Sequence, residues 1–432
     1  MNMKLRNIPF SPPDMTEAEA KEVREAILSG WITTGPRTKK LESLISEYVH
    51  TDKTVCLNSA TAALEMVLHL LDIQPDDEVI VPAYTYTATA SVTQHVGCKL
   101  VLVDSQKDNV EMDYDKLADA ITEKTKVICP VDLGGIVADY DRVFEIVEAK
   151  KGLFKPNNAL QAKIGRIVVS ADCAHSFGAS QKGKMAGEIA DFSSFSFHAV
   201  KNFTTAEGGA LTWKLAFGNE AVPTVVDYLP TVPKKEGETW NELLYRISQL
   251  FSLHGQNKDA LAKTKLGAWE YDIIGPWYKC NMTDIMAALG LVQMERYPGI
   301  LERRYEIVRR YDAAIDDLNV NLDANHKVVY LNHKGEDHCG SHHLYIVRLL
   351  GRTREEVNRV IEQMAERQIA CNVHYKPLPM MTAYKALGFD IKDYPNAYHL
   401  FENEVTLPLH TKLTDEDVEY VISNFVEIVK GL

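Results

Sequence analysis

The chain has 432 residues, of which 46% are hydrophobic and 25% are charged, so it is long enough for more than one domain and too apolar to be disordered. Its formal net charge of -13, without a basic patch, excludes general affinity for nucleic acids and anionic membrane surfaces. The N-terminal residues lack the apolar core of a signal peptide, and no apolar run approaches the roughly 20 residues that span a bilayer. We therefore expect a soluble, cytoplasmic protein.

The cysteines are odd in number and scattered, and no two of them form a CxxC pair. This pattern favours reduced thiols over a disulfide framework, and it predicts no zinc or other metal site. Most of them lie in apolar or strand-like stretches, where small core residues are expected. The seven positions are Cys56, Cys98, Cys129, Cys173, Cys280, Cys339 and Cys371.

From about residue 54, short β-rich runs alternate with runs of helical periodicity, which is the pattern of a parallel sheet covered by helices. Helices are predicted at 60–71, where Leu64, Val67 and Leu71 recur at helical spacing, and at 139–150. The sequence therefore predicts a large α/β domain. Its strands are expected at 54–58, 78–82, 99–104, 126–131, 166–170, 192–197 and 210–213.

Two stretches interrupt this alternation. Residues 151–165 are polar and contain Pro156, which indicates a surface insertion. Residues 214–275 combine three prolines with an amphipathic run at 243–253, and we expect an insertion over the active-site side of the large domain.

The last third of the chain has a different pattern. Residues 282–318 read as a long helix that links two domains, and a mixture of β-like and helical segments follows it. The predicted organisation is an N-terminal arm and large domain over 1–285, and a linking helix with a smaller α+β domain over 286–432. The β-like segments are 342–350 and 370–375, and the helical ones are 353–367 and 415–429.

Lys201 is the residue with the most informative surroundings, because a β-rich run ends just before it and Gly208-Gly209 precede the next predicted strand. Pyridoxal 5′-phosphate (PLP) enzymes need a lysine that binds the cofactor's aldehyde, an anion-binding cradle, an acid at the pyridine nitrogen and usually a stacked aromatic ring. Candidates for all four occur in this chain. We therefore predict a PLP site around Lys201.

The candidate phosphate cradle is Ser59-Ala60-Thr61, which closes a strand and opens a helix. The free N–H groups at a helix N-terminus bind anions, although ordinary N-capping by Ser59 is the alternative interpretation. Ser196, five residues before Lys201, could add a hydroxyl to the same phosphate.

Asp172 follows an apolar run, and an acid at the carboxyl end of such a strand can pair with the pyridine nitrogen. A helix cap is the alternative. His175 could contact the cofactor's ring oxygen or only satisfy a buried hydrogen bond. Tyr84 and Tyr86 follow another strand, and either ring could cover the cofactor's face, with core packing as the default.

Together these motifs resemble the DegT and StrS family of sugar aminotransferases, which have the aspartate aminotransferase-like (type I) PLP fold. The resemblance runs from Pro9 nearly to the C-terminus, and its strength lies in the order and spacing of many short matches. The matching stretches are 29–36, 59–61, 77–82, 172–179, 196–209, 281–284 and 373–378.

The resemblance implies that Lys201 binds PLP covalently and moves protons between substrate and cofactor. It further implies that Asp172 holds the pyridine nitrogen, that Tyr86 stacks on the ring, and that Ala60, Thr61 and Ser196 bind phosphate. Asn281 would reach the phosphate of a neighbouring subunit, so the resemblance implies a homodimer with shared sites. Candidate substrate-binding residues in the matching stretches are Thr33, His198, His374 and Tyr375.

The expected reaction moves an amino group from L-glutamate, leaving 2-oxoglutarate, to a nucleotide-linked keto sugar, at C4 of a 4-keto-6-deoxyhexose. A 4-keto pentose, a C3 keto sugar, a PLP lyase or desulfurase, and a non-catalytic regulator are the alternatives. Lysine at position 201 favours an aminotransferase over relatives that dehydrate sugars, which have histidine there. The sequence departs from the family pattern at Ala171, where an acid often stands, and in the segments 151–165 and 214–275.

Overall fold

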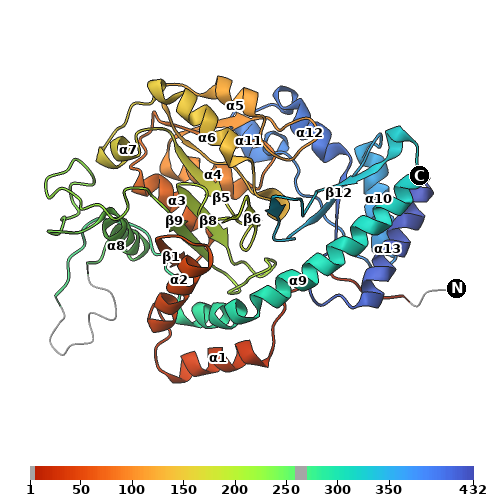
Figure 1. Ribbon diagram of the computed structural model, residues 1–432, viewed down its shortest axis with the longest axis horizontal. Helices are drawn as coiled ribbons and strands as arrows, with labels where there is room; N and C mark the ends of the chain where they lie inside the picture. Colours follow the sequence, from red (N-terminus) through yellow and green to blue (C-terminus); the bar gives the residue numbers. More distant parts are fainter. Residues whose placement is uncertain (1–4, 258–269) are drawn as a thin grey trace.

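The computed structural model describes residues 5–257 and 270–432, and a mixed seven-stranded sheet forms its centre (Figure 1). The strand order is β1-β9-β8-β5-β4-β2-β3. The strands are β1 (Lys53–Leu57), β2 (Glu78–Pro82), β3 (Lys99–Val103), β4 (Thr125–Ile128), β5 (Val168–Asp172), β8 (Phe192–Ser196) and β9 (Gly209–Trp213).

The sheet is mainly parallel. The pairs β2–β3, β2–β4, β4–β5 and β5–β8 are parallel, whereas β9 runs antiparallel to both of its neighbours, β1 and β8. All seven predicted strands are therefore confirmed, with ends that shift by up to three residues.

Both faces of the sheet are apolar. Successive side chains of a strand point to opposite faces, so an unbroken apolar run supplies both. In β2, Val79 and Val81 belong to one buried cluster and Ile80 belongs to the other. Helices α3, α4, α7 and α8 contribute to the first cluster, and α2, α5, α6 and the start of α9 contribute to the second. Their bounds are α2 (Pro36–Tyr48), α3 (Ala60–Leu70), α4 (Thr87–Val96), α5 (Tyr114–Ala120), α6 (Tyr140–Ala149), α7 (Ala159–Ile164), α8 (Trp240–Ser252) and α9 (Asp284–Val320).

Helix α9 is 37 residues long and crosses the molecule diagonally in Figure 1. Its contacts include α1 (Glu17–Leu28) and α2 beside the large sheet, and α13 (Asp415–Lys430) and β10 (Val328–Tyr330) beside the C-terminal part. The predicted linking helix over 282–318 is thereby confirmed. No helix in residues 5–257 or 270–432 is long and apolar enough to cross a bilayer.

The C-terminal part contains a three-stranded antiparallel sheet in the order β10-β12-β13, with β12 at Tyr345–Leu349 and β13 at Glu404–Leu407. A third buried cluster lies between this sheet, α10 (Arg354–Glu366), α13 and the second half of α9. Small elements complete the fold: α11 (Thr382–Ala386), α12 (Pro395–Glu402), β6 (Ser180–Gln181), β7 (Lys184–Met185) and β11 (His338–Cys339).

The structure differs from the sequence prediction in the C-terminal part. Residues 370–375 form no strand, and only Asn372 makes an isolated bridge, to Thr406 of β13. After Asn372 the chain leaves the C-terminal sheet, and His374 and Tyr375 line a cavity beside the large sheet. Of the three strands, β12 lies within the predicted segment 342–350, whereas the sequence analysis missed β10 and β13.

The two predicted insertions also have unexpected features. Residues 151–165 include the short helix α7, which buries Leu160. The described part of 214–275 packs through α8 against α3 and β1, and it contributes no residue to the lining of that cavity. Residues 258–269 of this predicted insertion lie outside the described residues.

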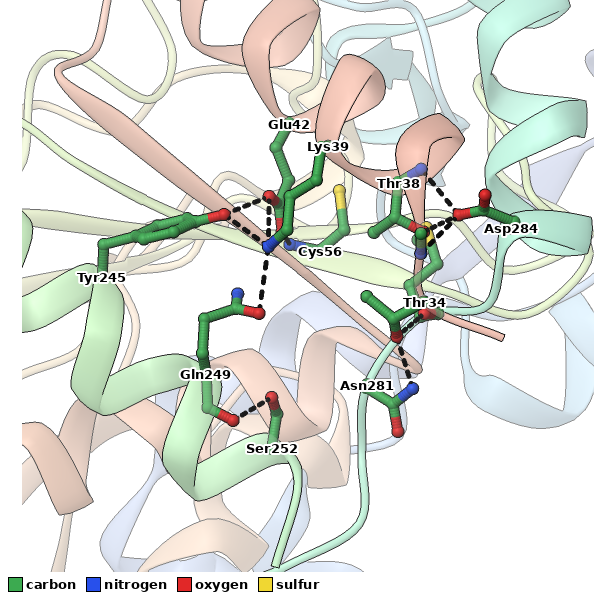
Figure 2. A network of polar contacts seen from close by, with 12 residues as sticks. Thr34, Thr38, Lys39, Glu42, Cys56, Tyr245, Gln249, Ser252, Asn281 and Asp284 are labelled. Carbon is green, nitrogen blue, oxygen red and sulfur yellow. Dashed lines mark hydrogen bonds and ion pairs between the residues drawn. The ribbon is translucent and has the colours of Figure 1, made fainter. Parts of the chain in front are cut away.

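A buried carboxylate joins α9 to α2, as Figure 2 shows. The N-cap of α2 is Gly35, which has no side chain to cap the helix, and Asp284 takes over this function. Its carboxylate accepts hydrogen bonds from the backbone N–H groups of Gly35 (2.8 Å), Arg37 (3.1 Å) and Thr38 (2.9 Å) and from the Thr38 hydroxyl (2.7 Å). The linking helix is thus fixed to the large sheet through the N-terminus of α2.

Replacing Asp284 by alanine should lower the free energy of unfolding by about 2–4 kcal/mol, because several buried donors lose their acceptor. Urea denaturation followed by circular dichroism measures this effect. The matched control is Asp317→Ala, an exposed acid on the same helix, which should change stability by less than about 0.5 kcal/mol. Equal effects of the two substitutions would contradict the capping role of Asp284.

Candidate active site

A cavity of about 450 Å³ lies where the carboxyl ends of β5 and β8 meet the amino end of α3. This edge of a parallel sheet is where α/β proteins usually bind ligands. Most of the residues predicted from the sequence line this cavity: Ser59, Ala60, Thr61, Tyr86, Asp172, His175, Ser196, His198, Lys201, His374 and Tyr375.

Lys201 lies in a turn after β8, in which its backbone N–H donates to the carbonyl of His198 (2.9 Å). Burial lowers the pKa of the Lys201 amine to about 8, although the charge of Asp172 acts in the opposite direction. An amine with this pKa is partly neutral near physiological pH, and only the neutral amine is a nucleophile. Lys201 is therefore suited to react with an aldehyde.

Asp172 is the last residue of β5 and is buried. One carboxylate oxygen accepts from the Thr89 hydroxyl (2.7 Å) and the other from the Ala174 N–H (3.1 Å). Burial raises the pKa of this carboxyl group, and the two hydrogen bonds and the charge of Lys201 act in the opposite direction. A buried carboxylate in this position favours a cationic ligand that can donate to it.

The turn into α3 lies beside the cavity as the predicted anion cradle requires. Ser59 caps the helix by accepting from the Ala62 N–H (3.1 Å), so the capping interpretation is confirmed. Ala60, Thr61 and Ser196 line the cavity beside it. Gly209 of β9 lies so close that a Cβ atom would overlap the backbone of Ser59 and Ala60. Glycine at 209 therefore allows the strand to approach the N–H groups at the helix N-terminus.

The two tyrosines after β2 have different environments. Tyr84 is 1% exposed and donates a hydrogen bond to the carbonyl of His374 (2.9 Å), so it is a core residue. Tyr86 lines the cavity and is 59% exposed, with its ring centroid 5.9 Å from that of Tyr375. Of Tyr84 and Tyr86, only Tyr86 is free to cover a planar ligand.

His175 is buried, and burial keeps the pKa of its imidazole well below the usual value. The neutral ring accepts at Nδ1 from the Gly134 N–H (3.2 Å), so its hydrogen is on Nε2, which lies 3.1 Å from the Tyr375 hydroxyl. Because that hydroxyl accepts from His175, its own hydrogen remains available to a ligand in the cavity.

Two predicted site residues lie outside this cavity. Thr33 precedes α2, and its carbonyl accepts from the Asp284 N–H (3.0 Å). Asn281 donates to the Thr34 hydroxyl near the start of α2, as Figure 2 shows. Neither residue is among those that line the cavity, although Asn281 makes an isolated bridge to Leu57 of β1.

The structure adds residues to the site that the sequence analysis missed. Phe10 and Ser11 from the N-terminal arm, Glu207, and His343 before β12 all line the cavity. Glu207 lies six residues after Lys201, within the matching stretch 196–209, whereas no local pattern marks Phe10, Ser11 and His343. Thr89 is different, because it lies one helical turn after Tyr86 on α4, so helix geometry could have linked it to the site.

These residues match what PLP requires. The cradle at α3 suits a phosphate, the buried Asp172 suits a protonated pyridine nitrogen, Tyr86 offers an exposed ring, and Lys201 offers a reactive amine. The glycine at 209 is a second, independent feature, since any side chain would fill the space at the cradle.

Comparisons with known proteins agree with this geometry. The model of the DegT/DnrJ/EryC1/StrS aminotransferase family matches residues 13–426. The chain belongs to this family. It is 32% identical to the UDP-4-amino-4-deoxy-L-arabinose–oxoglutarate aminotransferase of Shewanella sediminis, over 98% of each chain. It is also 32% identical to the spore coat polysaccharide biosynthesis protein SpsC of Bacillus subtilis, over 98% of this chain and 97% of SpsC.

Among solved structures, Spr1654 of Streptococcus pneumoniae, which is named as a sugar aminotransferase, is similar to this chain. Its structures include a PLP form and a pyridoxamine 5′-phosphate (PMP) form. The PLP form has a TM-score of 0.88 and 54% identity, and the alignment covers 99% of each chain. The PMP form has a TM-score of 0.88 and 56% identity, over 98% of this chain and all of the other. At the level of the family, the predictions of a type I fold, a sugar aminotransferase and PLP as its cofactor are confirmed.

Proposed function

We propose that this aminotransferase moves the amino group of L-glutamate to C4 of a nucleotide-linked 4-keto-6-deoxyhexose. The observation that carries the proposal is the convergence of Lys201, Asp172 and the anion cradle of α3 on one cavity. The remaining wall of that cavity includes His198, His374 and Tyr375, whose polar atoms can bind the hydroxyl groups of a sugar.

The protein's part in the reaction follows from these positions. Bound PLP supplies an electron sink for the charge that develops when an amino acid loses its α-proton. Asp172 would hold the pyridine nitrogen in its protonated form, and Tyr86 would cover the ring. Lys201 would anchor the cofactor and, when displaced by a substrate amine, would take the α-proton and return it to the cofactor.

A 4-keto pentose is a second candidate acceptor. It is favoured by the relative from Shewanella sediminis, whose name gives UDP-4-amino-4-deoxy-L-arabinose as its substrate. The desulfurase alternative needs a reactive thiolate on a loop, and Cys280 lies in the loop before α9. Burial raises the pKa of the Cys280 thiol to about 11, and this residue does not line the cavity, so it is unsuited to that chemistry.

Purified holoenzyme mixed with L-glutamate should convert its cofactor to the amino form, and subsequent addition of a 4-keto sugar should reverse the change. Absorbance spectroscopy follows both steps. Lys201→Ala should slow each step by roughly a hundredfold to ten-thousandfold, because it removes the proton carrier.

The matched control for this experiment is Lys155→Ala, a lysine paired with Glu123 on the surface, which should react at the parent rate. A parent-like rate for Lys201→Ala would refute its assignment. Conversion by glutamate without reversal by any keto sugar would refute the proposed acceptor.

We also propose that the enzyme is a homodimer whose two sites each combine residues of both subunits. The support is the position of Asn281, which the family resemblance assigns to the phosphate but which lies outside the cavity of its own chain. A neighbouring subunit that presents its Asn281 to the cradle at Ser59–Thr61 would complete the site.

Mixed dimers test this arrangement directly. Lys201→Ala and Asn281→Ala homodimers should each have low activity. Coexpression of the two variants should restore activity, because one site of each mixed dimer would combine an intact Lys201 with an intact Asn281 from the other chain. Tandem purification with two different tags, followed by the transamination assay, measures the recovery. If Asn281 acts within its own chain, the mixed dimer has no intact site and activity stays low.

A further inference from the structure

A buried carboxylate lies behind the cavity wall, outside the residues that line it. Glu404 begins β13 and is fully buried. One of its oxygens accepts from the backbone N–H of His374 (3.0 Å), and the other accepts from the hydroxyl of Thr406 (2.6 Å). Isolated buried carboxylates destabilise a fold, so the position of Glu404 calls for a functional explanation.

Thr406 connects this carboxylate to an imidazole that faces the cavity. Its hydroxyl oxygen lies 2.9 Å from Nδ1 of His374, and Thr406 itself is fully buried. A hydroxyl has one hydrogen to donate. If Thr406 donates it to an ionised Glu404, the hydroxyl must accept from Nδ1–H of His374. Burial lowers the pKa of His374 to about 3, so the ring is neutral and its Nε2 then carries a lone pair.

The ring of His374 is fixed in place by its neighbours. Phe10 of the N-terminal arm stacks on it with centroids 5.6 Å apart, and Tyr375 packs against it edge-on at 5.0 Å. His374 lines the cavity, and no residue within 5–257 or 270–432 forms a hydrogen bond with its Nε2. Nε2 is therefore the polar atom that His374 offers to a substrate.

Protonation of Glu404 reverses the direction of the two hydrogen bonds that the Thr406 hydroxyl makes, to Glu404 and to His374. The oxygen facing the His374 N–H must stay an acceptor, so the added proton lies on the oxygen facing Thr406. Thr406 then accepts from Glu404 and donates to Nδ1, and the imidazole hydrogen moves to Nε2. The net change is one proton gained at Nε2, in the cavity, although the acid itself is buried behind it.

We propose that Glu404 is a positioning residue that determines, through Thr406, whether Nε2 of His374 accepts or donates a hydrogen bond in the cavity. The inference rests on the proposed function, in which one cavity binds a dicarboxylate and a sugar in turn. A carboxylate can only accept, so it binds the donor form of His374, whereas a sugar hydroxyl can pair with either form.

Both tautomers of His374 can be populated within an accessible pH range, because burial raises the pKa of Glu404 to about 8. The hydrogen bonds from Thr406 and His374 and the charge of Arg354 act against burial. The groups that face Glu404 include cations, phenols and a thiol. They are Arg348, which is its partner in the β12–β13 ladder, Arg354 of α10, which donates to its carbonyl, and Tyr84, Cys371, His374 and Tyr375. As pH rises through this pKa, Nε2 changes from donor to acceptor.

Nitrogen-15 NMR of the holoenzyme labelled at histidine reads this tautomer directly, with the His374 signal assigned by its loss in His374→Asn. In the parent protein, the hydrogen should lie on Nε2 at about pH 6.5 and on Nδ1 at about pH 9.5. Glu404→Gln should keep it on Nε2 throughout. The amide oxygen must face the His374 N–H, so the amide NH₂ donates to Thr406, as the protonated acid does.

Glutarate, a dicarboxylate without an amino group, is the ligand for the binding arm of the experiment. Its dissociation constant should rise about tenfold in the parent between about pH 7 and 9.5, which is the loss of roughly one hydrogen bond. In Glu404→Gln it should change by less than about threefold. Isothermal titration calorimetry of the holoenzymes measures both values.

The matched control is Glu42→Gln. Glu42 is also a buried carboxylate that accepts from a backbone N–H, that of Cys56 (3.0 Å), and from a hydroxyl, that of Tyr245 (2.7 Å), but it lies away from the cavity (Figure 2). Its substitution should leave the His374 tautomer and the binding of glutarate as in the parent.

The proposal is overturned if His374 of the parent protein has the same tautomer at both pH values. It is also overturned if Glu404→Gln behaves like the parent in the NMR measurement or in the glutarate titration. The parent measurement needs no variant to fold. Neither the NMR measurement nor the glutarate titration requires turnover. If the proposed sugar acceptor is wrong, this is seen separately, because the keto sugar is not converted.

Discussion

The burial of the Asp172 carboxylate is the constraint on which the rest of this site depends. Burial raises the pKa of Asp172 against the hydrogen bonds from Thr89 and Ala174 and the charge of Lys201, so its ionised form needs a cationic group beside it. A protonated pyridine nitrogen meets that need, and the negative charge in turn keeps the nitrogen protonated. The same site lowers the pKa of Lys201 to about 8, so the amine that must react with the cofactor is partly neutral.

The fold holds these two groups at one edge of a sheet. Asp172 ends β5, Ser196 ends the neighbouring β8, and Lys201 follows five residues later. The antiparallel strand β9 lies on the other side of β8 and brings Gly209 against the N-terminus of α3. An anion cradle, an acid and an amine from three separate parts of the sequence thereby face one cavity.

The sequence predicted the parts of the protein that local patterns determine. The seven strands are short apolar runs between turns, and both faces of their sheet are covered, so they were recognisable without structural information. Lys201 and Asp172 were identified because each follows such a strand. The local pattern did not separate Tyr84 from Tyr86, since burial distinguishes them and burial depends on tertiary packing; the family resemblance pointed to Tyr86.

Long-range contacts account for what the sequence did not reveal. Phe10 and His343 reach the cavity from distant parts of the chain. Segment 370–375 has the composition of a strand, but tertiary contacts place His374 and Tyr375 in the site, and β12 pairs with β10 and β13 instead. Glu404 is an acid within a buried strand, and its contact with His374 appears only when the two segments lie side by side.

The C-terminal part is therefore more than a support for the catalytic sheet. It supplies His343, His374 and Tyr375 to the cavity wall, and Tyr375 shares a hydrogen bond with His175 from the large sheet side. Helix α9 joins the two parts and is itself anchored by Asp284 at the start of α2. Movement of the C-terminal part relative to the sheet would change the substrate side of the cavity and leave Asp172 and Lys201 in place.

The protonation state of the cofactor's pyridine nitrogen tests the central role of Asp172 most directly. Nitrogen-15 NMR of the protein reconstituted with PLP labelled at that nitrogen should show a protonated signal in the parent from about pH 6 to 9, and a neutral one in Asp172→Asn. A neutral nitrogen in the parent, or an unchanged signal in the variant, would contradict the account.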